Sequence, residues 1–328
     1  MSALLHSLRA FSYVPVLTTS SDQYAQRDNP SLFIRGSILT RTSKVAKLIS
    51  QRQLSPKTLN RSIYHGFTNF NHAFTPRSWR CQRVQTVHDL IPLLASSSLP
   101  KKVQYRFLLE RSISRSDVII CVSKWTKDTC EDMFPASRGK CFVIPNGIFK
   151  GRLKSPEPGK HLLFVSRFEN YKGFDLIVKL TQNLDEGQSV IVVTNQLGKK
   201  YLEQKVGSPK NLLVKVAISD DELGKLYRSS SIVIHPSRYE GYCLPASEAI
   251  INGKPVIYLS GSGIDETVGD AGIGLSPGAQ ISDWHSAISS LTKRQKLRDS
   301  LLTQDIKNQQ NVLKDWADVA QSVLSIYN

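Results

Sequence analysis

The chain has 328 residues and a mass of 36.7 kDa, which is enough for two domains of roughly 150 residues with a core each. Its five cysteines, at positions 81, 121, 130, 141 and 243, show neither disulfide nor zinc-ligand spacing, which favours a reducing cytoplasm and no structural metal. No apolar run approaches the roughly 18 residues that span a bilayer, so we predict neither a signal peptide nor a membrane span.

The net charge of +16 is concentrated in the first half of the chain. Residues 1–150 hold 22 of the 43 Lys and Arg but only 8 of the 27 Asp and Glu, and segment 35–61 is basic with no acidic residue. We expect this surface to attract anions over about a Debye length. This charge fits three kinds of partner: nucleic acid, anionic lipid headgroups and a phosphorylated acceptor. It also fits a basic face that is merely solvated.

Strand-like and helix-like segments alternate through the first half. The segment 101–116 predicts a helix that covers a sheet, with Val103, Phe107 and Leu108 on one stripe. This is the pattern of an α/β domain. Strands are predicted at 13–19, 62–67, 83–90, 117–123 and 141–147.

Two prolines and a glycine in 152–160 predict a linker, which places the domain boundary near 150. The alternation then restarts, and its continuous apolar strands indicate a parallel sheet covered on both faces, as in a Rossmann-like domain. The last segment, 313–328, has apolar residues at helical spacing. Strands are predicted at 161–168, 189–194, 211–217, 231–237 and 255–260.

The most informative segment is 235–255, HPSRYEGYCLPASEAIINGKP. A strand ends near His235 and a helix begins around Pro245, so free loop N–H groups and the helix dipole favour an anion there. Glu240 in the loop can accept hydrogen bonds from sugar hydroxyls, and Glu248, one turn into the helix, can reach a second polyol. A helix start with ordinary capping acids would show the same pair.

Three further sets of residues lie at the ends of predicted strands. In SRFENYKGFDL, Arg167 and Lys172 flank a loop and can converge on one diphosphate, although surface cations would look alike. His88 and His65 end two neighbouring strands, where open α/β sheets place residues that contact ligands. No Ser-His-Asp order, dinucleotide fingerprint or Walker loop is present.

The segment from Glu240 to Glu248 resembles the donor-site signature of the retaining GT-B glycosyltransferases of family 4, E-G-F-G-L-P-x-x-E, and the resemblance extends from about residue 84 to the C-terminus. It implies a GT-B fold, in which two Rossmann-like domains face each other across a cleft. The acceptor-side domain would be 1–150 with a return helix at 306–328, and the donor domain 151–305. The chain begins with what resembles the helix after the family's first strand, so we expect that strand to be missing.

The resemblance also implies roles for individual residues. Glu240 contacts the transferred sugar and Glu248 the nucleotide ribose, while Arg167 and Lys172 bind the diphosphate. The backbone at Cys243 and Leu244 would approach the sugar and diphosphate, although the family usually has Gly where this chain has Cys243. His88, in a TVHDL motif of one branch, would reach the transferred sugar. His65 is assigned to the acceptor side from its position alone.

We therefore expect transfer of a hexose from a nucleotide-diphosphate sugar to an acceptor hydroxyl with retention of configuration, in cell-envelope polysaccharide or glycolipid synthesis. No metal or cofactor is expected, because Arg167, Lys172 and backbone amides supply the positive charge. The TVHDL branch favours GDP-mannose, with UDP-sugars and other donors open.

The expected partners are a glycan or lipid-linked acceptor and an anionic membrane surface, on which a cytoplasmic enzyme would be peripheral on the inner face; nucleic acid is not expected. Two alternatives remain. One is a polyanion-binding or nucleic-acid-binding protein on an inactive GT-B scaffold, and the other is a nucleotide-sugar epimerase or hydrolase. The joint presence of Arg167, Lys172, Glu240 and Glu248 favours the transferase.

Overall fold

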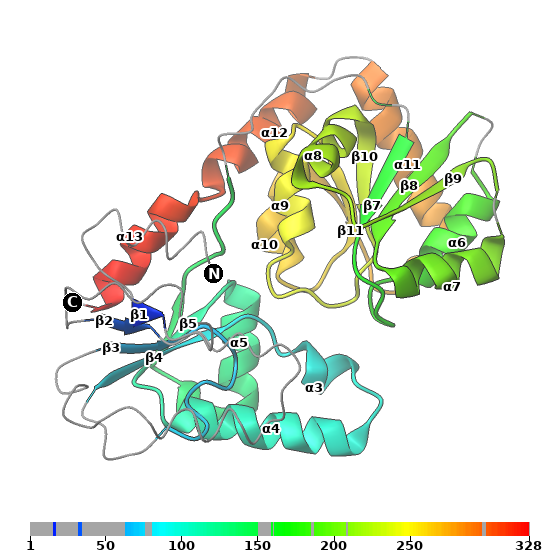
Figure 1. Cartoon of the computed structure of the whole chain (residues 1–328). Helices are drawn as coiled ribbons and strands as arrows, with labels where there is room; N and C mark the ends of the chain where they lie inside the picture. Colours follow the sequence, from blue (N-terminus) through cyan, green and yellow to red (C-terminus); the bar gives the residue numbers. More distant parts are fainter. Residues whose placement is uncertain are drawn as a thin grey trace. The chain divides into compact units, whose positions relative to one another are not determined.

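The computed structural model describes residues 16–17, 32–34, 63–75, 81–149, 159, 161–184, 187–207, 209–296 and 300–327. The basic segment 35–61, the predicted linker apart from Gly159, and the first 15 residues lie outside this part. The chain divides into two compact units, one of 1–147 with 314–328 and one of 148–313. Each contains a six-stranded parallel sheet (Figure 1).

The strands of the first unit lie in the sheet in the order in which they occur along the chain. Its described helices are α3 (Ile91–Ala95), α4 (Leu99–Ser114), α5 (Lys124–Met133) and α13 (Trp316–Tyr327), with a 3-10 turn, η2 (Pro135–Ser137). The strand at 32–34 was not predicted from the sequence. The strands are β1 (Val16–Leu17), β2 (Leu32–Ile34), β3 (Ile63–Gly66), β4 (Gln82–Val87), β5 (Val118–Cys121) and β6 (Cys141–Val143).

Alternate residues of the central strands serve two cores, because successive side chains in a strand point to opposite faces. On one face, Val87 and Ile119 pack with Leu109 and Ile113 of α4. On the other face, Val84 and Ile120 pack with Val319 and Val323 of α13. The end of the chain therefore closes the core of the first unit.

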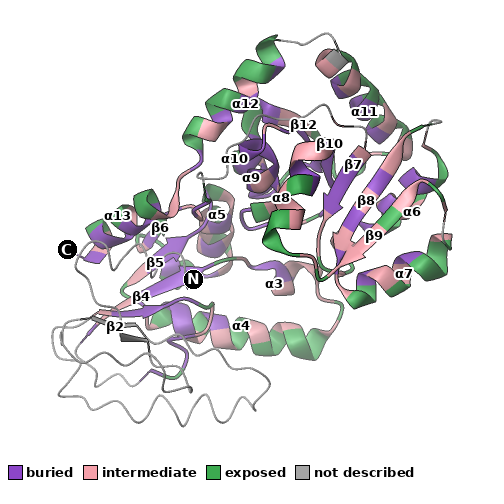
Figure 2. Ribbon diagram, turned by 45° about the horizontal axis from the view of Figure 1, so that its top comes forward, coloured by how far each residue is buried: buried purple, intermediate pink, exposed green. Residues whose placement is uncertain are grey.

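The structure corrects the predicted orientation of α4. Its buried residues are Leu109, Ser112 and Ile113, whereas Val103 and Phe107 are exposed. Figure 2 shows the buried residues toward the end of α4 beneath the sheet, while its first half is exposed or half-buried. The apolar pattern predicted the wrong face because this helix has apolar residues on two sides, and only its second half packs on the strands.

The second sheet has the order β12-β11-β10-β7-β8-β9, so the chain builds outward from β7 in both directions. The order reverses between β7 and β10, and ligands of open α/β sheets bind beyond the carboxyl ends of the strands at such a switch point. Strand β12 was not predicted. The strands are β7 (His161–Val165), β8 (Ser189–Thr194), β9 (Leu212–Val216), β10 (Ser230–His235), β11 (Val256–Leu259) and β12 (Gly272–Leu275).

The predicted boundary at residue 306 falls inside α12 of the second unit. The structure places α12 wholly in this unit, because the amides of Gln309 and Gln310 donate hydrogen bonds to the carbonyls of Thr267 and Ile250. The return to the first unit begins at Lys314. The helices are α6 (Phe174–Gln182), α7 (Gln196–Val206), α8 (Asp220–Ser229), α9 (Leu244–Ile251), α10 (Ile264–Val268), α11 (Ile281–Lys296) and α12 (Ser300–Val312), with a 3-10 turn, η4 (Gly269–Ala271).

Two buried histidines make the first unit sensitive to acid. Burial and the nearby His72 and His88 lower the pKa of His65 to about 3, and burial, opposed by a hydrogen bond to the Val84 carbonyl, lowers the pKa of His72 to about 4. In the unfolded chain a histidine has a pKa of about 6.5, so below this pH the unfolded chain binds protons that the folded unit does not bind. Stability should therefore fall as the pH drops from 7 to 5.

Urea unfolding followed by tryptophan fluorescence at the two pH values measures this loss. In the variant His72→Gln, the amide keeps an N–H donor for the Val84 carbonyl but no longer titrates, so the dependence on pH should be shallower. Equal unfolding free energies of the unaltered protein at pH 7 and pH 5 would contradict the assignment.

Candidate functional site

Two loops meet at the switch point of the second sheet, 166–173 after β7 and 236–243 after β10. Gly173 has a φ of 76°, and a Cβ at this position would lie 2.4 Å from the carbonyl oxygen of Pro236. The Arg238 N–H also donates a hydrogen bond to the Tyr171 carbonyl at 2.9 Å. Only glycine fits this left-handed, crowded position without strain. The two loops are therefore held in direct contact.

Glu240 is buried between cationic and polar partners from three segments. Its Oε1 accepts hydrogen bonds from Lys172 Nζ at 2.5 Å and from His235 Nε2 at 2.7 Å. Its backbone N–H donates to Ser262 Oγ at 3.3 Å, and its carbonyl accepts from the Gly263 N–H at 2.9 Å. Its Oε2 has no hydrogen-bond partner among the described residues, so one oxygen is left to accept a bond from a ligand hydroxyl.

The charges of this cluster stabilise one another. Burial alone would raise the pKa of Glu240, but His235 and Lys172 outweigh it and lower that pKa to about 2. Burial likewise opposes the charged form of Lys172, and Glu240 more than compensates, so the Lys172 pKa is raised. A buried carboxylate and ammonium therefore coexist at neutral pH. Removal of one partner of such a pair typically costs about 3–5 kcal/mol.

Cys243 precedes α9 in a conformation that disfavours its side chain. Its φ is 74°, and Ala217 is the other described non-glycine residue with positive φ. The thiol is buried, and its carbonyl accepts hydrogen bonds from the N–H groups of Ala246 and Ser247. The family signature has Gly at this position, where a left-handed φ costs nothing. Leu244, the first helical residue, carries an exposed side chain.

Glu248 lies one turn into α9, where the Tyr227 hydroxyl donates a hydrogen bond to its Oε2 at 2.8 Å. Burial and the Glu248 charge raise the Tyr227 pKa well above its ordinary value, which keeps the phenol protonated as a donor. Arg167 is exposed, and within the described ranges no hydrogen bond or ion pair engages its guanidinium. The structure thus brings Lys172, Cys243 and Glu240 into one cluster, and no hydrogen bond or ion pair among the described residues joins Arg167 to it.

Sequence reasoning missed three partners in this region, His235, Tyr227 and Ser262. His235 was detectable, because it is the last residue of β10, much as His88 directly follows β4 in the first unit. The other two reach their glutamates through tertiary contacts that no local pattern shows.

A metal ion is a conceivable occupant of this cluster, because one donor atom from each of His235, Glu240 and Cys243 lies within 4.8 Å of the others. The Lys172 ammonium already compensates the carboxylate charge from 2.5 Å. Burial and the Glu240 charge raise the pKa of the Cys243 thiol well above its ordinary value, so the neutral thiol is favoured over a thiolate ligand. The residues of this cluster therefore fit the Lys172 ammonium group better than they fit a metal ion.

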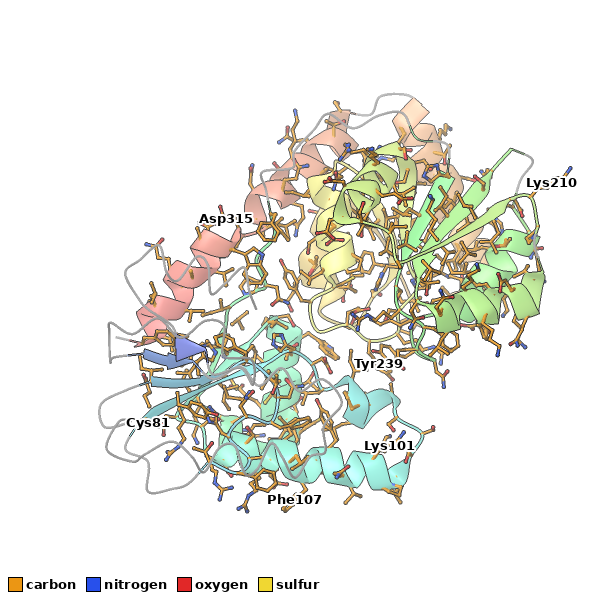
Figure 3. The ribbon with its side chains drawn as sticks, viewed as in Figure 1. Cys81, Lys101, Phe107, Lys210, Tyr239 and Asp315 are labelled. Carbon is orange, nitrogen blue, oxygen red and sulfur yellow. The ribbon has the colours of Figure 1, made fainter. Side chains whose placement is uncertain are left out.

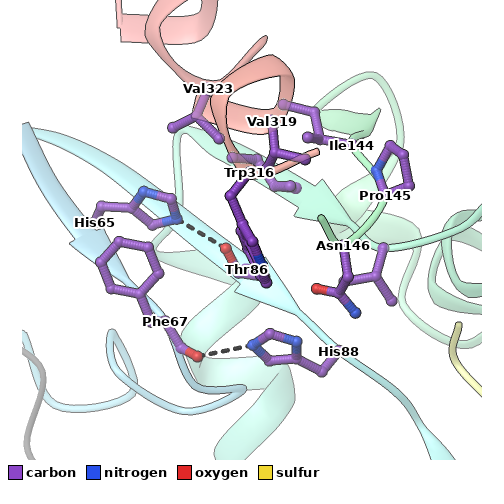
Figure 4. A pocket seen from close by; sticks show the side chains of 12 residues that line it. His65, Phe67, Thr86, His88, Ile144, Pro145, Asn146, Trp316, Val319 and Val323 are labelled. Carbon is purple, nitrogen blue, oxygen red and sulfur yellow. Dashed lines mark hydrogen bonds between the residues drawn. The ribbon is translucent and has the colours of Figure 1, made fainter. Parts of the chain in front are cut away.

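His65 and His88 come together in the first unit, beside a cavity of about 110 Å³ at the carboxyl ends of β3 to β6 (Figure 4). The ring nitrogens of His65 are hydrogen-bonded to the Tyr327 hydroxyl at 2.5 Å and the Thr86 hydroxyl at 2.8 Å. His88 Nε2 donates to the Phe67 carbonyl at 2.9 Å, which leaves Nδ1 as an acceptor. The lining is otherwise mainly apolar: Ile120, Val122, Ile144, Pro145, Asn146, Trp316, Val319 and Val323.

Comparison with known proteins gives matches over both units. The model of "Glycosyl transferases group 1" matches residues 147–308, and that of "Glycosyltransferase Family 4" matches residues 17–150. The O-antigen chain mannosyltransferase RfbU of Salmonella typhimurium is 25% identical over 240 residues, which cover 70% of this chain and 68% of that protein.

Solved structures of low sequence identity share the fold. Sucrose-phosphate synthase from Thermosynechococcus elongatus superposes with a TM-score of 0.74 at 18% identity, over 99% of this chain and 90% of that one. Anabaena HepE in complex with UDP-glucose gives a TM-score of 0.71 at 16% identity, over 95% of this chain and 98% of that one. The two parallel-sheet units therefore form a GT-B fold.

Glycine is usually less stabilising than alanine, but the left-handed conformation of Cys243 should reverse this order at position 243. Cys243→Gly should be more stable than Cys243→Ala by about 1 kcal/mol, because both remove the thiol but only glycine relieves the positive φ. At Ala246, a buried position inside the same helix, Ala246→Gly should instead cost about 1 kcal/mol. Urea unfolding of the three variants measures the differences, and a lower stability of Cys243→Gly than of Cys243→Ala would disprove the strain.

Proposed function

The chain belongs to the group 1 and family 4 glycosyltransferases, and we propose that it moves a hexose from a nucleotide-diphosphate sugar to an acceptor hydroxyl with retention of configuration. The observation that carries this proposal is the cluster of Lys172, His235 and Glu240 at the switch point of the second sheet. It provides a buried cation and an unshared carboxylate oxygen beside the start of α9. A nucleotide sugar offers a diphosphate and hydroxyls to match them.

In the proposed complex, Lys172 and Arg167 bind the diphosphate together with the N-terminal end of α9. Glu240 Oε2 accepts a hydrogen bond from the sugar, and Glu248, oriented by Tyr227, accepts one from the ribose. The negative charge on the diphosphate grows as the bond to the sugar breaks, so fixed cations stabilise the transition state more than the ground state. The proposal needs no metal ion or cofactor.

The first unit is proposed to bind the acceptor and the far side of the sugar. His88 Nδ1 is an acceptor oriented by the Phe67 carbonyl, and it would receive a hydrogen bond from a sugar hydroxyl. The ring nitrogens of His65 are engaged, so His65 would shape the acceptor cavity rather than bind through them. In the retaining mechanism, the acceptor proton passes to the leaving phosphate as the new glycosidic bond forms.

The relatives suggest which substrates to test first. The name of the Salmonella relative supports mannose as the sugar and a cell-envelope glycan or glycolipid as the product. The HepE complex keeps UDP-glucose among the donors. A lipid-linked acceptor would require the enzyme to reach a membrane surface, and the excess of positive charge in residues 1–150 supports such a peripheral association.

The two glutamates should separate sugar transfer from nucleotide binding. Glu240→Gln should abolish transfer but keep nucleoside-diphosphate affinity within about twofold, because this side chain is assigned to the sugar. Glu248→Gln should weaken that affinity about tenfold, the worth of one charged hydrogen bond. Calorimetric titration with GDP, UDP and ADP identifies the base and then compares the variants. Equal losses of affinity in the two would refute the assignment.

The cations should act together and without a metal. Lys172→Met and Arg167→Met should each lower diphosphate affinity and turnover at least tenfold, while Lys179→Met, a lysine of α6 outside the cluster, should change neither. Transfer by the unaltered protein should continue in EDTA. Loss of transfer on chelation, with recovery on addition of magnesium or manganese, would show that a metal carries part of the charge.

A further inference from the structure

Helix α4 exposes a row of large apolar side chains. Leu99, Val103 and Phe107 are 71%, 60% and 57% exposed, and their spacing of four residues places them along one side of the helix. Figure 3 shows the Phe107 ring on the side of α4 that is turned away from the sheet. Single exposed apolar residues are normal on protein surfaces, but a continuous row marks a site of interaction.

Basic residues are frequent in α4, and Lys102 and Arg106 each directly precede a member of this row. Lys101, Lys102, Arg106 and Arg111 belong to α4, and Glu110 is its one acidic residue. Among the described residues, neither lysine forms an ion pair. The helix therefore carries a net positive charge that no described neighbour compensates.

The two arginines are fixed by contacts with the first unit. Arg106 donates a hydrogen bond to the Met133 carbonyl at 3.2 Å. Arg111 donates to the Ala73 carbonyl at 2.6 Å, with its guanidinium 5.7 Å from the ring centre of Phe74, another exposed apolar residue. Arg106 and Arg111 therefore have fixed positions on the surface of the first unit.

We propose that this surface docks the protein on an anionic lipid bilayer, with Leu99, Val103 and Phe107 entering the boundary between headgroups and acyl chains. The exposed side of α4 offers apolar side chains and cations together, and these are the two features by which proteins bind an anionic membrane interface. Among the described helices, none is long and apolar enough to cross a membrane, so α4 would lie in the interface. We call Leu99, Lys102, Val103, Arg106 and Phe107 the α4 face.

Two other occupants fit this face less well. A nucleic acid would pair with the cations, but its phosphate backbone has no apolar surface to cover the three apolar side chains. A second copy of the chain would cover the apolar row but would bring two positively charged faces together. An anionic bilayer satisfies both features, because headgroups attract the cations and the acyl boundary receives the apolar side chains.

This inference rests on the peripheral association proposed above and identifies the element that performs it. It differs from docking by charge alone, which segment 35–61 would supply. Charge alone gives binding that disappears in salt, whereas inserted side chains retain part of the binding when salt screens the charges. The apolar residues of α4 therefore distinguish the two modes.

Co-sedimentation of the full chain with vesicles of phosphatidylcholine, with and without phosphatidylglycerol, tests the proposal. Val103→Gln combined with Phe107→Gln should weaken binding to anionic vesicles at least tenfold at both low and high salt. Lys102→Gln with Arg106→Gln should weaken it mainly at low salt. The matched control is Leu301→Gln with Val312→Gln on α12, where the side chains are 70% and 64% exposed, and it should bind as the unaltered protein does.

Several results would overturn the proposal: no preference of the unaltered protein for anionic vesicles, equal binding by the Val103 and Phe107 variant, or an equal loss in the control. A shift of that variant from dimer to monomer in sedimentation velocity would assign the face to self-association, and displacement from vesicles by duplex DNA at matched salt would assign it to nucleic acid. Binding is measured without donor, and transfer with a water-soluble acceptor, so failure of transfer with intact vesicle binding would reject the enzyme function alone.

Discussion

The carboxylate of Glu240 is the charge on which the candidate donor site depends. A carboxylate that is 7% exposed remains ionised only if nearby groups compensate the lost hydration, and here the Lys172 ammonium and the His235 ring share one of its oxygens. The ion pair joins the loop after β7 to the strand and loop of β10. It also leaves the second carboxylate oxygen without a partner among the described residues. One interaction therefore supplies both a cation for the diphosphate and a hydrogen-bond acceptor for a sugar hydroxyl.

The backbone of the two loops is organised around this pair. Gly173 permits contact with Pro236, and the Arg238 N–H bonds to the Tyr171 carbonyl on the other side of Lys172. Cys243 adds a buried thiol in a left-handed conformation at the point where the related enzymes usually have Gly. This chain therefore accepts backbone strain at Cys243, beside the proposed sugar position.

The local elements of the site could be predicted from the sequence, and its contacts could not. The sequence from 231 to 255 predicts a strand, a loop and a helix, because an apolar run, a Gly-Tyr-Cys turn and helix-forming residues follow one another there. Lys172 lies 68 residues from Glu240, so their pairing depends on how β7 and β10 adjoin. Helix α4 illustrates the same limit, because Val103 and Phe107 repeat as regularly as Leu109 and Ile113, and periodicity alone does not tell which pair faces the sheet. Strand β12 was missed because Gly272 and Gly274 weaken its strand pattern.

Hydrogen–deuterium exchange can show whether a nucleotide sugar binds at the carboxyl ends of β7 and β10, where the proposed function places it. Exchange is followed in the full chain with and without a saturating nucleoside diphosphate, so that each segment serves as a control for the others. We expect protection to concentrate in 166–173 and 236–248, with little change in the first unit. Protection confined to the first unit, or none in either loop when calorimetry shows that the nucleotide is bound, would contradict it.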